Sequence, residues 1–375
     1  MTPPPTTRPL TTRPLTISFF GSSLVSAYWN GAATYYRGVI RALAARGHRV
    51  TFYEPDAYER QRHRDMDDPD WCRVVVYAPT AADLDRCLDE GARADLVVKA
   101  SGVGVLDREL EAGVLAHRRP GSLVAFWDVD APATLERVQG DARDPFRALV
   151  PRYDVVFTYG GGPPVARAYE ALGARLCAPI YNALDPSTHH PSPPRPEWAA
   201  DLALLANRLP DRERRIDEFF LRAAALAPDR AFLLGGAGWA DKPLPVNVRA
   251  VGHVYTRDHN AFNSSARAVL NVARDSMART GWSPATRVFE AAGAGACLIT
   301  DAWEGLDDFL APGREVLVAR DGEEVARHLR DLSNADAAAI GAAARARVLL
   351  EHTYDHRARE VERVLQGGEA QRWSA

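Results

Sequence analysis

The sequence predicts an α/β protein made of two successive doubly wound domains, and three observations lead to this prediction. The chain has 375 residues, too many for one ordinary hydrophobic core and enough for two domains. Short apolar runs alternate with amphipathic helical segments along residues 16–182, and the alternation restarts along residues 199–350. Between them lies the proline-rich stretch 183–198, which we expect to be an extended linker because proline cannot donate to a strand ladder.

The apolar runs of the first half have the length and continuity of strands that are buried on both faces of a parallel sheet. They are Thr16–Gly21, Val50–Tyr53, Arg73–Ala78, Asp95–Ala100, Ser122–Trp127 and Tyr153–Tyr159. Between the first two runs, the amphipathic segment Ala32–Arg46 stops at Gly47, as a helix with a glycine after its last turn does.

The second half repeats this pattern. Its predicted strands are Leu202–Ala206, Ala231–Gly235, Val248–Val251, Ala268–Val272, Cys297–Thr300 and Val316–Ala319. Its predicted helices are Arg212–Leu226, His259–Ser264, Ala285–Ala294, Trp303–Leu310, Ala335–Leu350 and Tyr354–Leu365. Because open α/β sheets bind ligands at the carboxyl ends of their strands, we expect a ligand cleft between the two domains.

Composition restricts the class of protein. The net charge of −3 gives no basic excess for a nucleic-acid partner. The four cysteines are far apart and are expected to be free thiols. Residues 1–15 are rich in Pro and Thr and lack the apolar core of a signal peptide, so we expect a disordered tail. With no run of about 18 apolar residues, the sequence favours a soluble cytoplasmic protein.

The stretch Thr280–Asp301 (TGWSPATRVFEAAGAGACLITD) predicts a diphosphate site at the start of a helix. Ser283 is expected as the N-cap, with Pro284 at the first helical position. Arg287 falls in the first turn, where a positive charge is unfavourable unless an anion binds there. Glu290, one turn further, suits a ribose diol. The alternative is an ordinary buried helix with Glu290 at its solvated edge.

Asp128 and Asp130 follow a predicted strand directly, in WDVDAP, and are the candidate catalytic carboxylates. The D-x-D pattern also suits a divalent metal, but a three-residue motif is weak evidence and we predict a metal-free site. In the alternative reading, Asp130 caps the following helix and Asp128 is solvated. Because proline follows Asp130 closely, we favour Asp130 as a cap and Asp128 as the catalytic residue.

Polar and small residues after other strands are candidates for contact with a ligand in the expected cleft. The loop Gly21–Gly31 is not a G-x-G-x-x-G, so it does not indicate a dinucleotide. Its two aromatic residues can stack on a sugar, and its last two residues are expected to begin a helix. The candidates for this cleft are Tyr28, Trp29, Asn30, Gly31 and Gly161.

The histidines do not predict a metal site. We expect His189 and His190 in a solvated hinge, and His352 and His356 on one exposed helix face. Neither pair has the third ligand that a zinc site needs. The glycine cluster Gly235–Gly238 suits either a phosphate nest or a sharp turn, and we favour the turn.

Several blocks resemble a known family. They are YWNGAATYYRGVIRALAARGHRVTFYE, FWDVDAPATL, YGGGPPV, NRLPDRERR, FLLGGAGWADKPLP, NVRAVGHVYTRDHNAFN and RVFEAAGAGACLITD. Together they resemble the CgeB-like glycosyltransferases of the spore-maturation group, over nearly the whole chain after the tail. The resemblance implies the GT-B fold, with two Rossmann-like domains facing across a cleft and a C-terminal segment, 351–375, packing back across them.

The resemblance also implies roles for residues of the second domain, which would bind the donor nucleotide. Glu290 would hold the ribose, and Ser283, Thr286 and Arg287 at the helix start would hold the diphosphate. The remaining donor-binding candidates are Arg208 with Arg212 or Arg214 at the leaving diphosphate, Gly236 in the glycine cluster, and His253, Val254 and Tyr255 at the base. Related retaining enzymes carry a glutamate where this chain has Trp282, which leaves the stereochemical course open.

The predicted function is therefore metal-independent transfer of a sugar from a nucleotide-activated donor. The acceptor would be a small molecule, a natural product or a cell-envelope component, and no cofactor is expected. The alternatives are a nucleotide-sugar epimerase on the same fold and a non-catalytic, two-lobed sugar- or nucleotide-binding protein.

Overall fold

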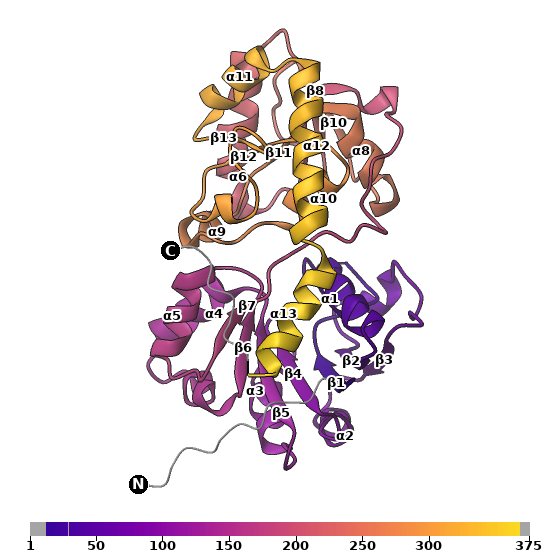
Figure 1. Cartoon of the computed structure of the whole chain (residues 1–375), viewed down its shortest axis with the longest axis vertical. Helices are drawn as coiled ribbons and strands as arrows, with labels where there is room; N and C mark the ends of the chain where they lie inside the picture. Colours follow the sequence, from indigo (N-terminus) through magenta and orange to yellow (C-terminus); the bar gives the residue numbers. More distant parts are fainter. Residues whose placement is uncertain (1–12, 29, 368–375) are drawn as a thin grey trace. The chain divides into compact units, whose positions relative to one another are not determined.

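The computed structural model describes residues 13–28 and 30–367, and within them the chain forms two compact units. Unit 1 contains the residues before Asn182 together with the segment that begins at Tyr354. Unit 2 contains Asn182–Thr353. Each unit is a parallel sheet flanked by helices (Figure 1). The prediction of two Rossmann-like α/β domains is confirmed.

Unit 1 has a seven-stranded sheet in the order β3-β2-β1-β4-β5-β6-β7. The strands are β1 (Thr16–Phe20), β2 (Arg49–Pro55), β3 (Arg73–Tyr77), β4 (Leu96–Ala100), β5 (Leu123–Asp128), β6 (Val155–Thr158) and β7 (Cys177–Pro179). The helices are α1 (Ala33–Ala45), α2 (Ala81–Gly91), α3 (Asp107–Ala116), α4 (Ala131–Gly140), α5 (Gly162–Ala171) and α13 (Tyr354–Leu365). The sequence did not predict β7, a three-residue edge strand that ends in proline.

The last helix that the structure describes, α13, is part of unit 1. Helix α13 packs on α1, where Gly38 leaves room for the ring of Tyr354. A β-carbon at Gly38 would lie 2.2 Å from that ring. Arg357 is buried and its Nε donates to the carbonyl oxygen of Tyr181. An ion pair between Arg46 and Glu362 joins the two helices at their exposed side.

Unit 2 has a six-stranded sheet in the order β10-β9-β8-β11-β12-β13. The strands are β8 (Ala200–Leu205), β9 (Phe232–Gly235), β10 (Val248–Gly252), β11 (Ala266–Asn271), β12 (Cys297–Asp301) and β13 (Leu317–Ala319). The helices are α6 (Pro210–Ile216), a π-helical turn (Asp217–Leu221), α7 (Arg222–Leu226), α8 (His259–Ser265), α9 (Asp275–Thr280), α10 (Thr286–Gly293), α11 (Gly322–Asp331) and α12 (Asn334–Glu351). The predicted linker residues 183–198 have little regular secondary structure, with a turn at 186–188 and a 3₁₀ turn at Pro196–Trp198.

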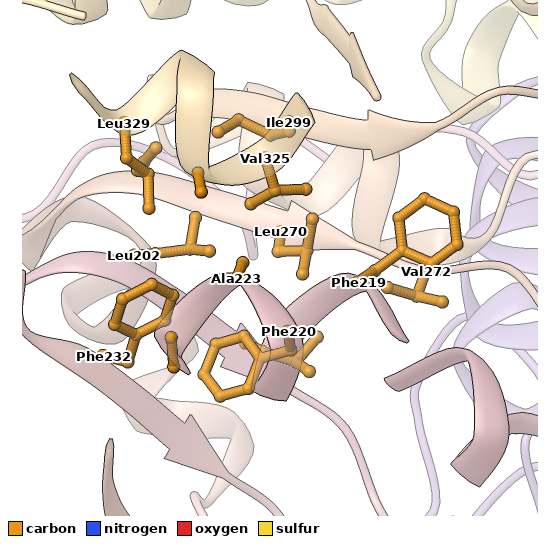
Figure 2. Close-up of a cluster of buried hydrophobic side chains, with 14 of the residues drawn as sticks. Leu202, Phe219, Phe220, Ala223, Phe232, Leu270, Val272, Ile299, Val325 and Leu329 are labelled. Carbon is orange, nitrogen blue, oxygen red and sulfur yellow. The ribbon is translucent and has the colours of Figure 1, made fainter. Parts of the chain in front are cut away.

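The core of unit 2 lies between its sheet and the helices on one face. Figure 2 shows Leu202 and Leu270 from the central strands packed against Phe220 and Val325 from the helices. All four side chains are fully buried, which stabilises the sheet on which the candidate site is built.

Three predicted features differ from the structure. The predicted helix Trp303–Leu310 is only a 3₁₀ turn at Leu306–Asp308, preceded by Gly305 in a left-handed conformation. Helices α9 and α11 were not predicted, although Asp321 caps α11 by accepting from the Glu324 backbone N–H. His352 ends α12 while His356 lies in α13, so the two histidines do not share a helix.

The four cysteines are buried and unpaired, as predicted. None of the helices in the described part of the chain combines the length and the apolar character that crossing a bilayer requires.

Candidate functional site

The strand order of unit 2 reverses between β8 and β11, its two central strands. From β8 the chain continues to β9 on one side, and from β11 it continues to β12 on the other. Such a reversal leaves a crevice at the carboxyl ends of the central strands, where doubly wound sheets bind ligands. The segments at this edge are the loop 206–209 with α6, and the loop 281–285 with α10.

The loop before α10 is held in an unusual conformation. Trp282 has a left-handed φ of 40°, and its indole is buried with Nε1 donating to Asp308 Oδ2 at 2.7 Å. Helix α10 begins at Thr286 with Ala285 as the N-cap, and no side chain caps it. The prediction of Ser283 as the N-cap is wrong, because its hydroxyl turns back to donate to the carbonyl oxygen of Gly281. The start of α10 therefore offers its N–H groups to a ligand.

Two arginines at this edge carry no carboxylate partner within the described part of the chain. Arg287, in the first turn of α10, donates from NH1 to Asn271 Oδ1 at 3.2 Å. Arg212, on α6, donates from NH2 to the carbonyl oxygen of Asn207. The Nε atom of each is buried without a hydrogen-bond partner.

The charges of these two guanidinium groups are poorly compensated. Burial, followed by the nearby charge of Arg212, lowers the pKa of Arg287 to about 10. Burial also lowers the pKa of Arg212. Two half-buried cations beside an uncapped helix N-terminus form an environment that an anion with several oxygen atoms would stabilise.

The other predicted arginines are engaged in surface ion pairs. Arg208 pairs with Glu213 at 2.8 Å and with Asp241 at 2.9 Å, and these carboxylates raise its pKa. Arg214 is largely exposed and pairs with Asp275. Of the three predicted arginines Arg208, Arg212 and Arg214, the structure thus brings only Arg212 close to Arg287.

Sequence analysis missed a supporting ion pair beneath the site. Arg215 donates from NH2 to the buried carboxylate of Asp301 at 2.5 Å and from Nε to the carbonyl oxygen of Ala273. This pair ties α6 to the carboxyl ends of β11 and β12. The sequence feature that could have indicated this pair is Asp301, an acidic residue directly after the predicted strand Cys297–Thr300.

The glycine cluster supports the loop that precedes α6. Gly236 has φ of 123°, and a β-carbon there would lie 2.1 Å from the carbonyl oxygen of Ala206. The Ala237 N–H donates to Asn207 Oδ1. These contacts give the cluster the sharp-turn role that we favoured, and they support the loop that leads to Arg212.

The predicted base-binding residues form a short segment after β10. Val254 is buried, while His253 and Tyr255 are exposed. The two exposed rings meet edge to face with centroids 4.7 Å apart. Exposed aromatic rings of this kind can pack on a nucleobase.

Glu290 is partly buried on α10, and two histidines lie next to it. His189 Nε2 lies 3.8 Å from Glu290 Oε1, and His259 is close to both. The prediction of His189 as a solvated hinge residue is wrong, because it is only 5% exposed. The prediction that His189 lacks the further ligands of a metal site is wrong too, because His259 and Glu290 approach it from other elements.

In unit 1, Asp128 ends β5 and has no exposed surface. Its Oδ1 accepts from Ser101 Oγ, the Asp130 N–H and Thr134 Oγ1, and its Oδ2 accepts from Tyr169 OH at 2.5 Å. Burial raises the pKa of this carboxyl group, and the four donors oppose that shift. The structure therefore gives Asp128 a role in ordering the turn after β5.

Asp130 occupies the N-cap position of α4, but its side chain does not cap the helix. The cap prediction is therefore wrong. The side chain is half-buried at the carboxyl edge of the unit 1 sheet.

The loop after β1 is folded on itself. Asn30 is buried, its Oδ1 accepts from Ser22 Oγ, and its Nδ2 donates to two backbone carbonyl oxygens. Tyr28 is 38% exposed and stacks on His63. Gly31 is exposed, and α1 begins after it at Ala33. Gly161 is buried before α5, and Trp29 lies outside the described residues.

Comparison with known proteins gives a partial family match and clear fold matches. A family model described as glycosyl transferase-like matches residues 212–363. No curated protein sequence matches the chain.

Solved structures match over nearly the whole chain. Sucrose-phosphate synthase from Thermosynechococcus elongatus has a TM-score of 0.66 at 16% identity, covering 95% of this chain and 99% of its own. HepE from Anabaena in complex with UDP-glucose has a TM-score of 0.66 at 13% identity, covering 94% and 100%. AviGT4, a glycosyltransferase involved in avilamycin A biosynthesis, has a TM-score of 0.59 at 18% identity, covering 95% and 99%. The chain therefore has the fold of GT-B glycosyltransferases.

Proposed function

We propose that the chain is a metal-independent glycosyltransferase that transfers a sugar from a nucleoside-diphosphate donor to an acceptor hydroxyl or similar nucleophile. The observation that carries the proposal is the pair Arg212 and Arg287, two half-buried cations without carboxylate partners among the described residues, beside the uncapped start of α10. The family match over 212–363 and the fold support it. The acceptor would be a small molecule, a natural product or a cell-envelope component.

The chemistry of transfer suits this arrangement. When the bond between the anomeric carbon and the diphosphate oxygen breaks, its electron pair stays on the diphosphate, which becomes more negative. Guanidinium groups and a helix N-terminus stabilise that charge without a metal ion. Glu290, one turn further along α10, would accept hydrogen bonds from a ribose diol. The acceptor oxygen bonds to the anomeric carbon and gives its proton to a base.

The first experiment measures the contribution of the arginine pair. Arg212→Gln and Arg287→Gln should each weaken binding of UDP, GDP, ADP or dTDP, whichever the protein binds. We expect a loss of about 1.5–3 kcal/mol, because each removes a charged hydrogen bond to the diphosphate. Isothermal titration calorimetry in EDTA gives the affinities, and UDP is the first choice because HepE was solved with UDP-glucose. Arg327→Gln, an exposed arginine of α11, is the control. Equal affinities in all four proteins would refute the diphosphate site.

A second measurement separates the ribose from the diphosphate. Glu290→Gln should weaken binding of the nucleoside diphosphate by about 1.5–3 kcal/mol and leave binding of inorganic pyrophosphate unchanged. Arg287→Gln should weaken both ligands. If Glu290→Gln bound both pyrophosphate and the nucleoside diphosphate with wild-type affinity, Glu290 would not be the ribose ligand.

Activity separates the transferase from an epimerase. A transferase consumes the donor at a rate that depends on acceptor, while an epimerase converts it to a new sugar nucleotide without one. Because no divalent ion is needed in the proposal, turnover should be the same in EDTA and in Mg²⁺ or Mn²⁺. Activity that vanished in EDTA and returned with Mn²⁺ would refute metal independence.

A further inference from the structure

Three side chains that bind metals converge beside the candidate donor site, from separate elements of unit 2. His189 belongs to the segment before β8, His259 is the first residue of α8, and Glu290 lies on α10. One ligand atom of each lies within 4.8 Å of the other two, and His189 Nε2 is 3.8 Å from Glu290 Oε1.

The segment that carries His189 is fixed to α8 on both sides of the histidine. Asn260 Nδ2 donates to the carbonyl oxygen of Thr188, and the His190 N–H donates to Asn260 Oδ1. The His189 N–H donates to the carbonyl oxygen of Asp185 at 3.0 Å. The cluster is therefore held by backbone contacts and not only by its side chains.

The hydrogen bonds around the two imidazoles leave one ring nitrogen of each available as a ligand. Thr188 Oγ1 donates to the carbonyl oxygen of Asp185, so it accepts from His189 Nδ1 at 3.0 Å. That tautomer leaves a lone pair on His189 Nε2, which is buried and has no hydrogen-bond partner. His259 Nε2 faces the carbonyl oxygen of Val254 at 3.3 Å and must be the donor there. Its Nδ1 then carries the lone pair.

The donor set is that of a zinc-type ion. Two neutral imidazoles and one carboxylate suit Zn²⁺, whereas Mg²⁺ and Mn²⁺ prefer oxygen ligands. Zinc bonds of about 2.0–2.1 Å place tetrahedral ligand atoms roughly 3.3 Å apart, so small side-chain rotations would close the cluster. Each histidine also has the outer hydrogen bond that orients a metal-bound imidazole.

We propose that His189, His259 and Glu290 form a binding site for Zn²⁺ or a similar late transition-metal ion, and that its occupancy inhibits donor binding by engaging the Glu290 carboxylate. The inhibitory part rests on the proposed function, in which Glu290 binds the ribose. The binding part stands on the geometry alone. The ion would act as an inhibitor and would take no part in sugar transfer.

The binding experiment titrates the full chain, freed of metal by chelation, with Zn²⁺ and separately with Mg²⁺ in a calorimeter. We expect one saturable zinc site per chain and no magnesium binding there. Loss of an outer hydrogen-bond partner weakens metal binding about 10–100-fold. We expect a larger loss of zinc affinity in each ligand variant: His189→Gln, His259→Ala and Glu290→Gln. His190→Ala is the matched control, because this neighbouring histidine is exposed.

Circular dichroism identifies any variant that fails to fold. If a histidine variant fails to fold, Glu290→Gln still tests the site, because glutamine has nearly the same shape as glutamate. Absence of a saturable zinc site in the wild type, or equal affinity in wild type and folded ligand variants, would overturn the proposal. The same loss in His190→Ala would also overturn it, because the zinc would then lie elsewhere in the linker.

The inhibitory part has its own readout. Zn²⁺ at saturation should weaken nucleoside-diphosphate binding at least about tenfold in the wild type and in His190→Ala, and not in His189→Gln. Zinc binding without any change in nucleotide affinity would refute inhibition and leave the metal site standing. If no nucleotide bound even without zinc, the proposed function would fail, while the zinc titration would still decide the metal site.

Discussion

Asp128 and Asp130 stand two residues apart but lie in different environments. Asp128 is fully buried and accepts four hydrogen bonds, whereas Asp130 is half-buried and does not cap α4. A general base must reach the proton that it removes, and a carboxylate without exposed surface reaches none from a substrate. We therefore propose Asp130 as the candidate base and Asp128 as the positioning residue that orients it through the Asp130 N–H.

Substitution separates these two roles. Asp130→Asn should leave nucleotide affinity and stability nearly unchanged and lower turnover by ~10²–10⁴-fold, because an amide cannot accept the proton. Asp128→Asn should lower the free energy of unfolding by about 1–3 kcal/mol, because an amide nitrogen would face the donors around it. Donor-consumption kinetics and urea unfolding measure the two effects. Normal turnover in Asp130→Asn would move the base elsewhere or indicate a mechanism without one.

The helix start at α10 illustrates what the sequence could and could not predict for one element. The stretch Thr280–Asp301 predicted a loop, a helix and a strand, and placed Arg287 in the first turn, as observed. It predicted the helix start too early, because a serine followed by proline has the composition of a cap. The left-handed Trp282 is held by tertiary contacts, because its N–H donates to the carbonyl oxygen of Glu304 and its indole donates to Asp308. No local pattern encodes these contacts.

The same limit applies to the histidine cluster. His189, His259 and Glu290 are separated by 70 and 31 positions in the chain, and only the fold brings them together. A search for metal ligands at short spacing therefore misses them. The arginine pair was partly predicted, Arg287 from its place in the first turn of a helix and Arg212 from the family resemblance, but the sequence did not distinguish Arg212 from Arg208 and Arg214. That distinction depends on which carboxylates lie nearby.

The loop that leads to α6 depends on Gly236, and this contact gives a prediction for the element. Gly236→Ala should lower the free energy of unfolding by about 1–3 kcal/mol or more, since the new β-carbon would clash with the carbonyl oxygen of Ala206 at a strained φ. Nucleotide affinity should fall as well, because the loop leads into α6, which carries Arg212. Gly252→Ala is the control, with positive φ but open space around it. An equal loss of unfolding free energy in both variants would mean that the backbone conformation, and not the clash, causes the loss.

For the whole molecule, the chain passes twice between its two units, near Tyr181 and again near Thr353. The strand orders β3-β2-β1-β4 and β10-β9-β8-β11 repeat one topology, which the repeated alternation of the sequence predicted. The assignment of α13 to unit 1 depends on long-range packing against α1 and on the contact of Arg357 with Tyr181. Periodicity predicts such a helix but not the unit on which it packs.

The packing of α13 can be tested at Gly38 and Tyr354. Gly38→Ala should destabilise unit 1 by about 1–3 kcal/mol, although alanine favours a helix, because its β-carbon would lie 2.2 Å from the Tyr354 ring. Gly140→Ala, in α4 with open space around it, should be neutral or stabilising. Tyr354→Leu should also destabilise, since it removes buried aromatic surface.

The double variant Gly38→Ala/Tyr354→Leu decides whether the two residues are coupled. It should lose less stability than the sum of the single variants, by about 0.5–3 kcal/mol, because the smaller side chain leaves room for the alanine methyl group. Urea unfolding followed by circular dichroism gives all four free energies. Additive losses would show that α13 does not pack on α1 through this contact. Nucleoside-diphosphate affinity should stay unchanged in folded variants, because the proposed donor ligands lie in unit 2 and α13 belongs to unit 1.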